Sequence, residues 1–225
     1  TRIGGFRVKT DLPSVALDEF EAKRLLAAYG VPVVGEQRVR DVDAAIAAAW
    51  HLGFPVALKA CGAEFAHKSD LGLVKLNLAD PAALRRAADE LHRAMDGRGE
   101  LLVQPMVSGR REFLAGMARD PQFGPVVTFG LGGIFAEALD DVTLRIAPLG
   151  FDDARSMLGE IRARALLGPL RGLPAVDTDA LVRILVALSR LALERPDIVA
   201  IDINPIIVSG TAPVAVDALV LTAAP

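Results

Sequence analysis

Three oxygen-bearing side chains near the C-terminus, Asp202, Asn204 and Asp217, form the most specific candidate site in the sequence. Side chains alternate between the two faces of a strand, so Asp202 and Asn204 share one face. Carboxylate and amide oxygens are ligands that Mg²⁺ prefers, provided that room remains for phosphates and water. A plain solvent-facing stretch explains these residues less well, because the sequence around them is almost wholly apolar. We call them the oxygen patch and predict a magnesium site there.

The geometry of the oxygen patch depends on one hairpin turn. If Gly210-Thr211 forms a two-residue loop, Ser209 pairs with Ala212. Continuing that register along both strands places Asn204 opposite Asp217. The sequence therefore predicts that residues from two strands meet at this site.

Two further polar positions interrupt apolar or loop surroundings. Lys59 is the single charge in the apolar run 54–60, and burying it without a partner would cost several kcal/mol. His67 lies in the polar loop 62–70, and a neutral imidazole there can accept a phosphoryl group. Read locally, a lysine that extends to solvent and an ordinary surface loop are the simpler interpretations of these two features.

Clustered glycines follow an expected strand at Gly130, Gly132 and Gly133. Their backbone N–H groups can cradle a phosphate, but the segment lacks the P-loop pattern. It also has Phe135 where the last glycine of a dinucleotide-binding turn would fall. A phosphate cradle and a plain tight turn both remain open.

The elements expected around these residues are typical of an α+β protein. A capping box from Asp18 to Glu21 begins the first helix, and Gly30 ends it. The order lacks the steady βαβ alternation of a doubly wound sheet, so we expect two α+β lobes, residues 1–103 and 104–225. The expected helices are 18–29, 44–51, 80–95, 152–162 and 178–194, and the expected strands are 31–39, 54–60, 71–78, 101–107, 113–119, 126–129, 198–208 and 214–221.

Composition excludes several classes of protein. The 225 residues are 52% hydrophobic and 24% charged, which is ordinary for a globular protein. A formal charge of −3 gives no indication of nucleic-acid binding or of a polybasic membrane patch, and no apolar stretch is long enough to span a bilayer. Cys61 is the single cysteine, so no intrachain disulfide is possible, and we expect a cytoplasmic protein.

Taken together, the motifs resemble those of the ATP-grasp domain (β subunit) of ADP-forming acetyl-CoA synthetases, relatives of the nucleotide subunit of succinyl-CoA synthetase. The resemblance covers nearly the whole chain in the family's order, which makes it specific. It implies an ATP-grasp fold with the nucleotide site between two α+β lobes. The matching stretches are 17–33, 53–59, 67–70, 103–107, 119–125, 129–149, 202–205 and 214–218.

The resemblance implies that five residues contact ATP. Lys59 would bind phosphate and the purine edge. Gln104, Met106 and Val107 would lie in the strand that lines adenine, and Glu112 would lie close to the ribose and phosphates.

The resemblance also implies a metal site and a phosphate relay. Asn204 and Asp217 would hold Mg²⁺, and Arg145 would neutralise phosphate charge. His67 would take part in phosphate relay, and Asp202 would lie near an incoming phosphohistidine. That phosphohistidine belongs to a CoA-binding α-type subunit or fused domain, which also takes up CoA and a small carboxylic acid. The chain would thus be an acid–thiol ligase that acts only with this partner, without nucleic acid or membrane.

Some positions depart from the family pattern, which keeps other functions open. Cys61-Gly62 stands where a Ser-Pro is usual, Gly72-Leu73 replaces a Gly-Gly, and Leu173 replaces a glutamate in an Arg-Gly-Glu-Pro motif. A non-catalytic nucleotide-binding module that regulates a larger acyltransferase is the alternative. A carboxylate–amine ligase of the wider ATP-grasp group is a third, more distant interpretation.

Overall fold

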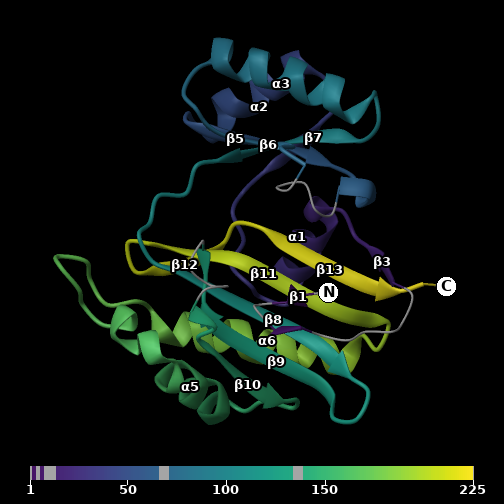
Figure 1. The fold of residues 1–225 in the computed structure, drawn as a ribbon. Helices are drawn as coiled ribbons and strands as arrows, with labels where there is room; N and C mark the ends of the chain where they lie inside the picture. The colour runs from purple at the N-terminus through teal and green to yellow at the C-terminus, as the bar shows by residue number, and fades with distance from the viewer. Residues whose placement is uncertain (1, 4–5, 8–13, 66–70, 134–138, 225) are drawn as a thin grey trace. The chain divides into compact units, whose positions relative to one another are not determined.

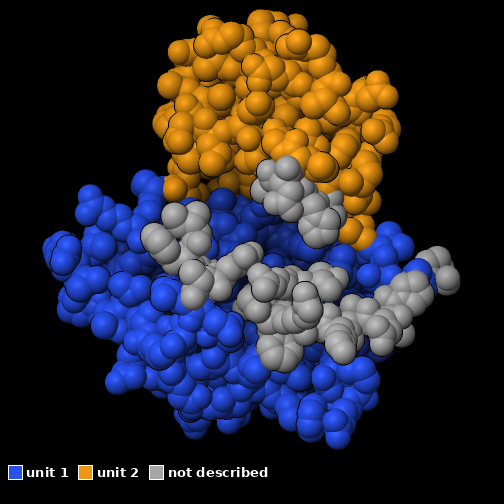
Figure 2. Space-filling view, viewed as in Figure 1, with its two compact units in different colours: residues 1–15, 23–33, 108–225 blue, residues 16–22, 34–107 orange. Residues whose placement is uncertain are grey.

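The computed structural model describes residues 2–3, 6–7, 14–65, 71–133 and 139–224. The chain forms two compact units, which Figure 2 shows in different colours. Unit 1 consists of Thr1–Val15, Lys23–Val33 and Ser108–Pro225, and unit 2 of Ala16–Ala22 and Val34–Val107. The lobe boundary at residues 103 and 104 stays a prediction, and the compact units have boundaries of their own.

Unit 2 is a four-stranded antiparallel sheet with two helices on one face (Figure 1). The strand order is β4-β7-β5-β6. Leu58 and Val103 point to the helices and belong to the core of the unit, together with Leu84 and Leu91 of α3. The elements are β4 (Gln37–Val39), α2 (Val42–Leu52), β5 (Val56–Cys61), the 3₁₀ turn η1 (Ala63–Phe65), β6 (Val74–Leu78), α3 (Pro81–Met95) and β7 (Glu100–Pro105).

Unit 1 contains a seven-stranded sheet, β10-β9-β8-β11-β13-β3, with β12 also paired to β11. Helices α5 and α6 pack together on one face of this sheet, against β8, β9 and β10 (Figure 1). The elements are β1 (Arg2–Ile3), β2 (Phe6–Arg7), β3 (Ser14–Ala16), β8 (Glu112–Asp120), β9 (Gly124–Leu131), β10 (Val142–Ile146), α5 (Phe151–Glu160), the 3₁₀ turn η3 (Arg162–Leu167), α6 (Thr178–Glu194), β11 (Ile198–Ser209), β12 (Ala212–Ala215) and β13 (Ala218–Ala223).

Helix α1 (Glu19–Ala28) begins where the sequence predicts. The Asp18 carboxylate accepts a 2.9 Å hydrogen bond from the backbone N–H of Glu21, as the capping box requires. Gly30 follows the helix with φ of 89°, a backbone conformation that glycine adopts without strain. The division of the chain places Glu19–Ala22 in unit 2 and Lys23–Ala28 in unit 1.

Two strand predictions need correction, and one strand of the large sheet is additional. The expected strand 31–39 is a strand only at Gln37–Val39, with an isolated bridge between Val33 and Ala215. The expected strand 214–221 is two strands, because the chain leaves the ladder between β12 and β13. Strand β10 was not predicted from the sequence at all.

Candidate functional site

The hairpin register predicted for the oxygen patch is confirmed. Ser209 pairs with Ala212 at the turn, and the same register continues into β13, where Ile203 pairs with Ala218. Between these pairs the backbone N–H of Val216 donates a 3.1 Å hydrogen bond to the Pro205 carbonyl oxygen. Asn204 and Asp217 therefore lie at matching positions, where β11 runs past the link between β12 and β13.

The chemistry of the oxygen patch fits Mg²⁺. Asn204 is exposed, and Asp202 and Asp217 are half-buried, so water and phosphate can reach them. Within the described residues no group of three or more His, Cys, Asp or Glu side chains is placed to hold a metal ion. Magnesium needs only one or two carboxylates when phosphates and water complete its shell, and the patch offers two carboxylates and an amide.

Strand pairing assigns Asp202 to the sheet face opposite α5 and α6. Directly paired residues share a face, and Asp202 pairs with Gly116, which pairs with Thr128. Thr128 is buried on this face, and its hydroxyl has no hydrogen-bond partner among the described residues. We call this face the polar face, after Asp202 and Thr128, whereas Met117 and Val127 on the other face belong to the buried core.

Arg145 lies on the other face of the same sheet. It pairs with Val127, which pairs with Met117, and both of these residues are fully buried. Its guanidinium group donates a 2.5 Å hydrogen bond to the carboxylate of Glu160 on α5. The structure therefore does not bring Arg145 together with Asp202, and the role of Arg145 at a phosphate stays a prediction.

Glu112 lies beside two of the glycines that the sequence marks as a phosphate cradle. Gly132 donates a 2.9 Å backbone hydrogen bond to the Glu112 carbonyl oxygen. Gly133 has φ of 75°, and a Cβ atom built there would meet the Glu112 carboxylate. The positive φ favours glycine at position 133, and the tight-turn and cradle interpretations both remain open.

Lys59 does not extend to solvent, so that interpretation is wrong. Its side chain is buried in unit 2 with 3% of the residue exposed, and its ammonium group donates a 2.7 Å hydrogen bond to Glu19, which is 5% exposed. A buried charge needs a partner of opposite sign, and Glu19 supplies it from the first turn of α1.

The predicted adenine strand lies beside Lys59. Gln104 on β7 pairs with Ala57 on β5, so Gln104 and Lys59 share the sheet face opposite α2 and α3. The Met106 backbone N–H donates a 3.0 Å hydrogen bond to the Pro55 carbonyl oxygen, which continues the pairing past the end of β7. Val107 follows without regular secondary structure.

The structure adds two residues that the sequence did not single out, Glu19 and Lys23. Both are almost fully buried, and both lie on α1, one helical turn apart. No local signal singles them out, because a glutamate and a lysine one helical turn apart are ordinarily a pair on the helix surface. His67 lies outside the described residues, so its predicted role stays a prediction.

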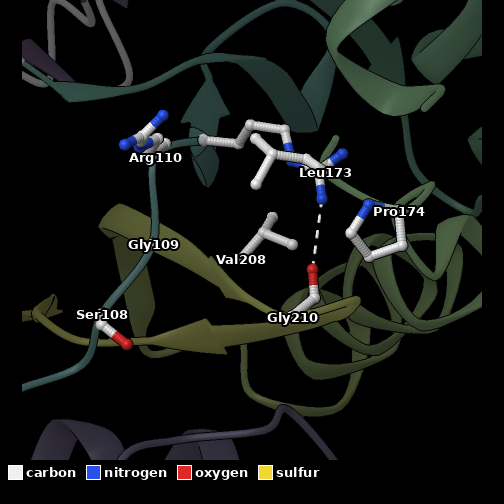
Figure 3. A pocket seen from close by; sticks show the side chains of 8 residues that line it. Ser108, Gly109, Arg110, Leu173, Pro174, Val208 and Gly210 are labelled. Carbon is white, nitrogen blue, oxygen red and sulfur yellow. Dashed lines mark hydrogen bonds between the residues drawn. The ribbon is translucent and has the colours of Figure 1, made fainter. Parts of the chain in front are cut away.

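The family departure at Leu173 lies at the wall of a pocket of about 230 Å³ in unit 1. Ser108, Arg110 and Arg111 also line this pocket (Figure 3). Arg111 is buried and donates hydrogen bonds to three backbone carbonyl groups; the dashed line in Figure 3 marks the 3.2 Å bond to Gly210. The pocket includes no residue of the predicted nucleotide site.

No helix in the described part of the chain is long and apolar enough to cross a membrane.

Comparisons with known proteins agree over nearly the whole chain. Residues 11–221 match the family described as ATP-grasp domain. The chain is 40% identical over 215 residues to the acetate–CoA ligase [ADP-forming] II subunit beta of Pyrococcus furiosus, covering 92% of this chain and 91% of that protein. It is also 40% identical over 192 residues to the acetate–CoA ligase [ADP-forming] I of Archaeoglobus fulgidus, where the match covers 83% of this chain and 28% of a longer protein.

Solved structures agree with the sequence matches. An acetyl-coenzyme A synthetase 1 of Ca. Korarchaeum cryptofilum, in complex with coenzyme A and Ca-AMPCP, superposes with a TM-score of 0.87 at 37% identity, covering 92% of this chain and 93% of that one. A second structure of the enzyme holds coenzyme A and Mg-AMPPCP, with a phosphohistidine segment pointing towards the nucleotide binding site, at a TM-score of 0.81 and 38% identity, covering 92% of each chain. These matches confirm the predicted fold.

Proposed function

Since the chain belongs to the ATP-grasp family, we propose that it is the nucleotide-binding β subunit or domain of an ADP-forming acyl-CoA synthetase. In this role it binds Mg-ATP and exchanges a phosphoryl group with a histidine on a CoA-binding partner. The acetate–CoA ligase β subunit of Pyrococcus furiosus and the Ca. Korarchaeum cryptofilum enzyme described above support this proposal. A cytoplasmic location stays a prediction.

The hairpin register of the oxygen patch is the observation that supports this proposal most directly. It brings Asn204 and Asp217 to matching positions on the polar side of unit 1. With Asp202 they offer the oxygen ligands that Mg²⁺ takes in nucleotide sites. Bound there, the metal ion would neutralise phosphate charge, which is the main electrostatic requirement of phosphoryl transfer.

Unit 2 supplies the residues that we assign to the phosphates and the base. Glu19 fixes the direction of the Lys59 side chain, and Lys59 is the cation that we assign to an ATP phosphate. Gln104 shares the same sheet face, and Met106 and Val107 continue its strand. We assign these three residues to the adenine ring, where backbone groups can read the base.

Glu112 and the neighbouring glycines are the groups that we assign to the ribose and phosphates. Backbone N–H groups that follow one another through glycines can bind anions at close range. Gly133, with φ of 75°, lies next to the Glu112 carboxylate. Arg145 is left out of the proposed site, because its sheet face and its pairing with Glu160 give it another role.

The phosphoryl group must reach the CoA-binding partner, and His67 is the residue that we propose for the relay. The chain's own groups need only hold the phosphate in line and neutralise its charge, so positioning is their main contribution. We propose that Asp202, on the polar sheet face, orients the partner's incoming phosphohistidine. The acid and CoA would bind through the partner.

The test measures ADP release from the chain mixed with a CoA-binding partner subunit, acetate, CoA and Mg-ATP. His67→Ala should stop turnover while ATP affinity, measured by calorimetry, stays within a few-fold of wild type. His92→Ala is the matched control, because His92 lies in the last turn of α3 and should leave both readouts unchanged. Near-normal turnover of His67→Ala would remove His67 from the mechanism. ATP binding without turnover by the wild type, with several partners and acids, would favour the regulatory module.

A further inference from the structure

Lys23 is one of the largest fully buried side chains of the protein, with 1% of the residue exposed. It lies on α1 in the part of the helix that belongs to unit 1. Moving an ammonium group out of water costs several kcal/mol unless hydrogen bonds replace the water. The ammonium group therefore needs hydrogen-bond acceptors inside the protein, and one of them is a backbone carbonyl group.

The Lys23 ammonium group donates a 3.2 Å hydrogen bond to the backbone carbonyl oxygen of Val216. Val216 belongs to the link between β12 and β13, where the chain has left the regular ladder. Its N–H donates to Pro205 at 3.1 Å, and the N–H of the preceding Ala215 donates to Pro32 at 2.8 Å. Val216 in the link and Ala215 at the end of β12 are thus held by three hydrogen bonds.

The residues of the oxygen patch are direct neighbours of these fixed groups. Asp217 follows Val216, whose carbonyl group accepts the Lys23 bond, and Asn204 precedes Pro205, which accepts the Val216 bond. A peptide group is rigid, so a bond to the carbonyl of residue 216 also fixes the N–H side of residue 217. The position of the Asp217 carboxylate relative to Asn204 therefore depends on Lys23.

We propose that Lys23 is a positioning residue of the magnesium site, which holds the β12–β13 link so that Asp217 and Asn204 bind one metal ion together. This inference rests on the proposed function, because it assigns Mg²⁺ to the oxygen patch. Lys23 acts on the backbone and not as a metal ligand. A charge-assisted hydrogen bond to a carbonyl is stronger than a neutral one, which suits a lysine to this position.

The experiment compares Lys23→Met, which keeps the length of the side chain and removes its donor, with Lys75→Met. Lys75 lies on β6, where it pairs with Glu90 near the surface, so it controls for the loss of a lysine. The first readout needs no metal: amide hydrogen exchange of Val216 and Asp217 in the free protein. Lys23→Met should accelerate exchange there by about tenfold or more, beyond any change at Ile203 on β11.

The second readout is the Mg²⁺ concentration that gives half of the thermal stabilisation by a non-hydrolysable ATP analogue. Lys23→Met should raise this concentration by about tenfold or more, and Lys75→Met should leave it unchanged. Asn204→Ala and Asp217→Asn are the references for a lost ligand, and both should abolish the Mg²⁺-dependent part of the stabilisation. If Lys23→Met does not fold, Lys23→Arg carries the test, because it keeps the charge and changes the reach.

Each outcome decides the inference. Faster exchange in the link together with a higher Mg²⁺ midpoint supports it. An unchanged midpoint overturns it, even when the melting temperature falls, because Lys23 would then have only a structural role. If the wild type shows no Mg²⁺-dependent stabilisation, the proposed magnesium site is wrong, and the inference that rests on it is wrong as well. The exchange readout separates these last two cases, because it reports on the link without metal.

Discussion

Lys59 and Glu19 form an ion pair of 2.7 Å in which both side chains are almost fully buried in unit 2. The pair joins the middle of β5 to the first turn of α1, 40 residues earlier in the chain. Breaking a buried pair by removing one partner leaves the other charge buried and uncompensated. This one contact therefore contributes to the folding of unit 2 as well as to the direction of the proposed phosphate ligand.

We predict that Lys59→Met lowers the free energy of unfolding by about 3–5 kcal/mol, because Glu19 loses its counter-ion. Adding Glu19→Gln should restore part of that loss, since the double variant buries no charge at either position. Urea denaturation of the two single variants and the double variant measures the coupling. Arg85→Ala is the matched control, because Arg85 forms an exposed 2.8 Å pair with Asp43 and should cost less than about 1 kcal/mol. The prediction would be contradicted if the double variant lost as much free energy of unfolding as the Lys59 and Glu19 single variants lose together.

The second prediction separates Arg145 from Asp202, which lie on opposite faces of one sheet. Arg145→Met should cost up to about 1 kcal/mol of stability, because its pair with Glu160 is partly exposed. The affinity of the Arg145→Met variant for Mg-ATP, measured by calorimetry, should stay within a few-fold of wild type. Asp202→Asn should instead leave stability nearly unchanged and reduce turnover with the CoA-binding partner. A large loss of nucleotide affinity in Arg145→Met would restore the role implied by the family resemblance.

The sheet face on which Arg145 lies shows what sequence comparison leaves out. Resemblance assigns a role to a position, but the face on which a side chain lies follows from strand pairing. Strand β10 was not predicted, so no register was available to place Arg145 relative to Asp202. The hairpin at Gly210 was predictable for the opposite reason, because a two-residue turn fixes the register of both strands that it joins.

Local signals predicted the helices well. Asp80 and Pro81 mark the start of α3, and the Asp80 carboxylate accepts a 2.8 Å hydrogen bond from Ala83, as an N-cap residue should. The Lys59 environment was not predictable in this way. Its partner Glu19 is distant in sequence, and no local pattern reports which of several carboxylates lies against a buried lysine.

The third prediction concerns Cys61, whose thiol is buried with 3% of the residue exposed. Burial, with the nearby Asp18 carboxylate as the second cause, raises the pKa of this thiol to about 12. In the unfolded chain the thiol loses its proton near pH 8.5, so between about pH 9 and pH 12 the folded state binds more protons than the unfolded state. The contribution of the protonated Cys61 thiol to stability is therefore complete below its pKa in the unfolded chain, and it is lost as the pH rises towards its pKa in the folded protein.

We therefore expect the wild type to lose stability more steeply than Cys61→Ala as the pH rises above about 9. Urea melts of both proteins at a series of pH values measure the difference, and the titration of lysines and tyrosine cancels in the comparison. The native thiol should also resist alkylation at neutral pH, because the thiolate is the reactive form. Parallel pH profiles, or rapid alkylation of the folded protein, would show that Cys61 is accessible and ionises normally.

The last prediction concerns Leu173, which stands where the family motif has a glutamate. Arg171 and Gly172 form the tight turn before it, with φ of 46° and 83°, and the backbones of Leu170 and Leu173 exchange two hydrogen bonds. The turn is thus retained, and only the side chain at its end has changed. That side chain lines a pocket together with Arg110, which is exposed, so a carboxylate there would meet positive charge.

Leu173→Glu should therefore fold and be more stable than Leu173→Gln, by up to about 1 kcal/mol at low ionic strength. Glutamine is the matched control, because it has the shape of glutamate without the charge. The difference should shrink in about 1 M salt, where charges are screened beyond a few ångströms. Arg110→Ala in the Leu173→Glu background should remove most of it, which chemical denaturation at both salt concentrations can measure. Equal stability of the glutamate and glutamine variants at low salt would mean that the pocket arginines do not reach position 173. The glutamate of the family motif would then need a partner outside this chain, such as the CoA-binding subunit.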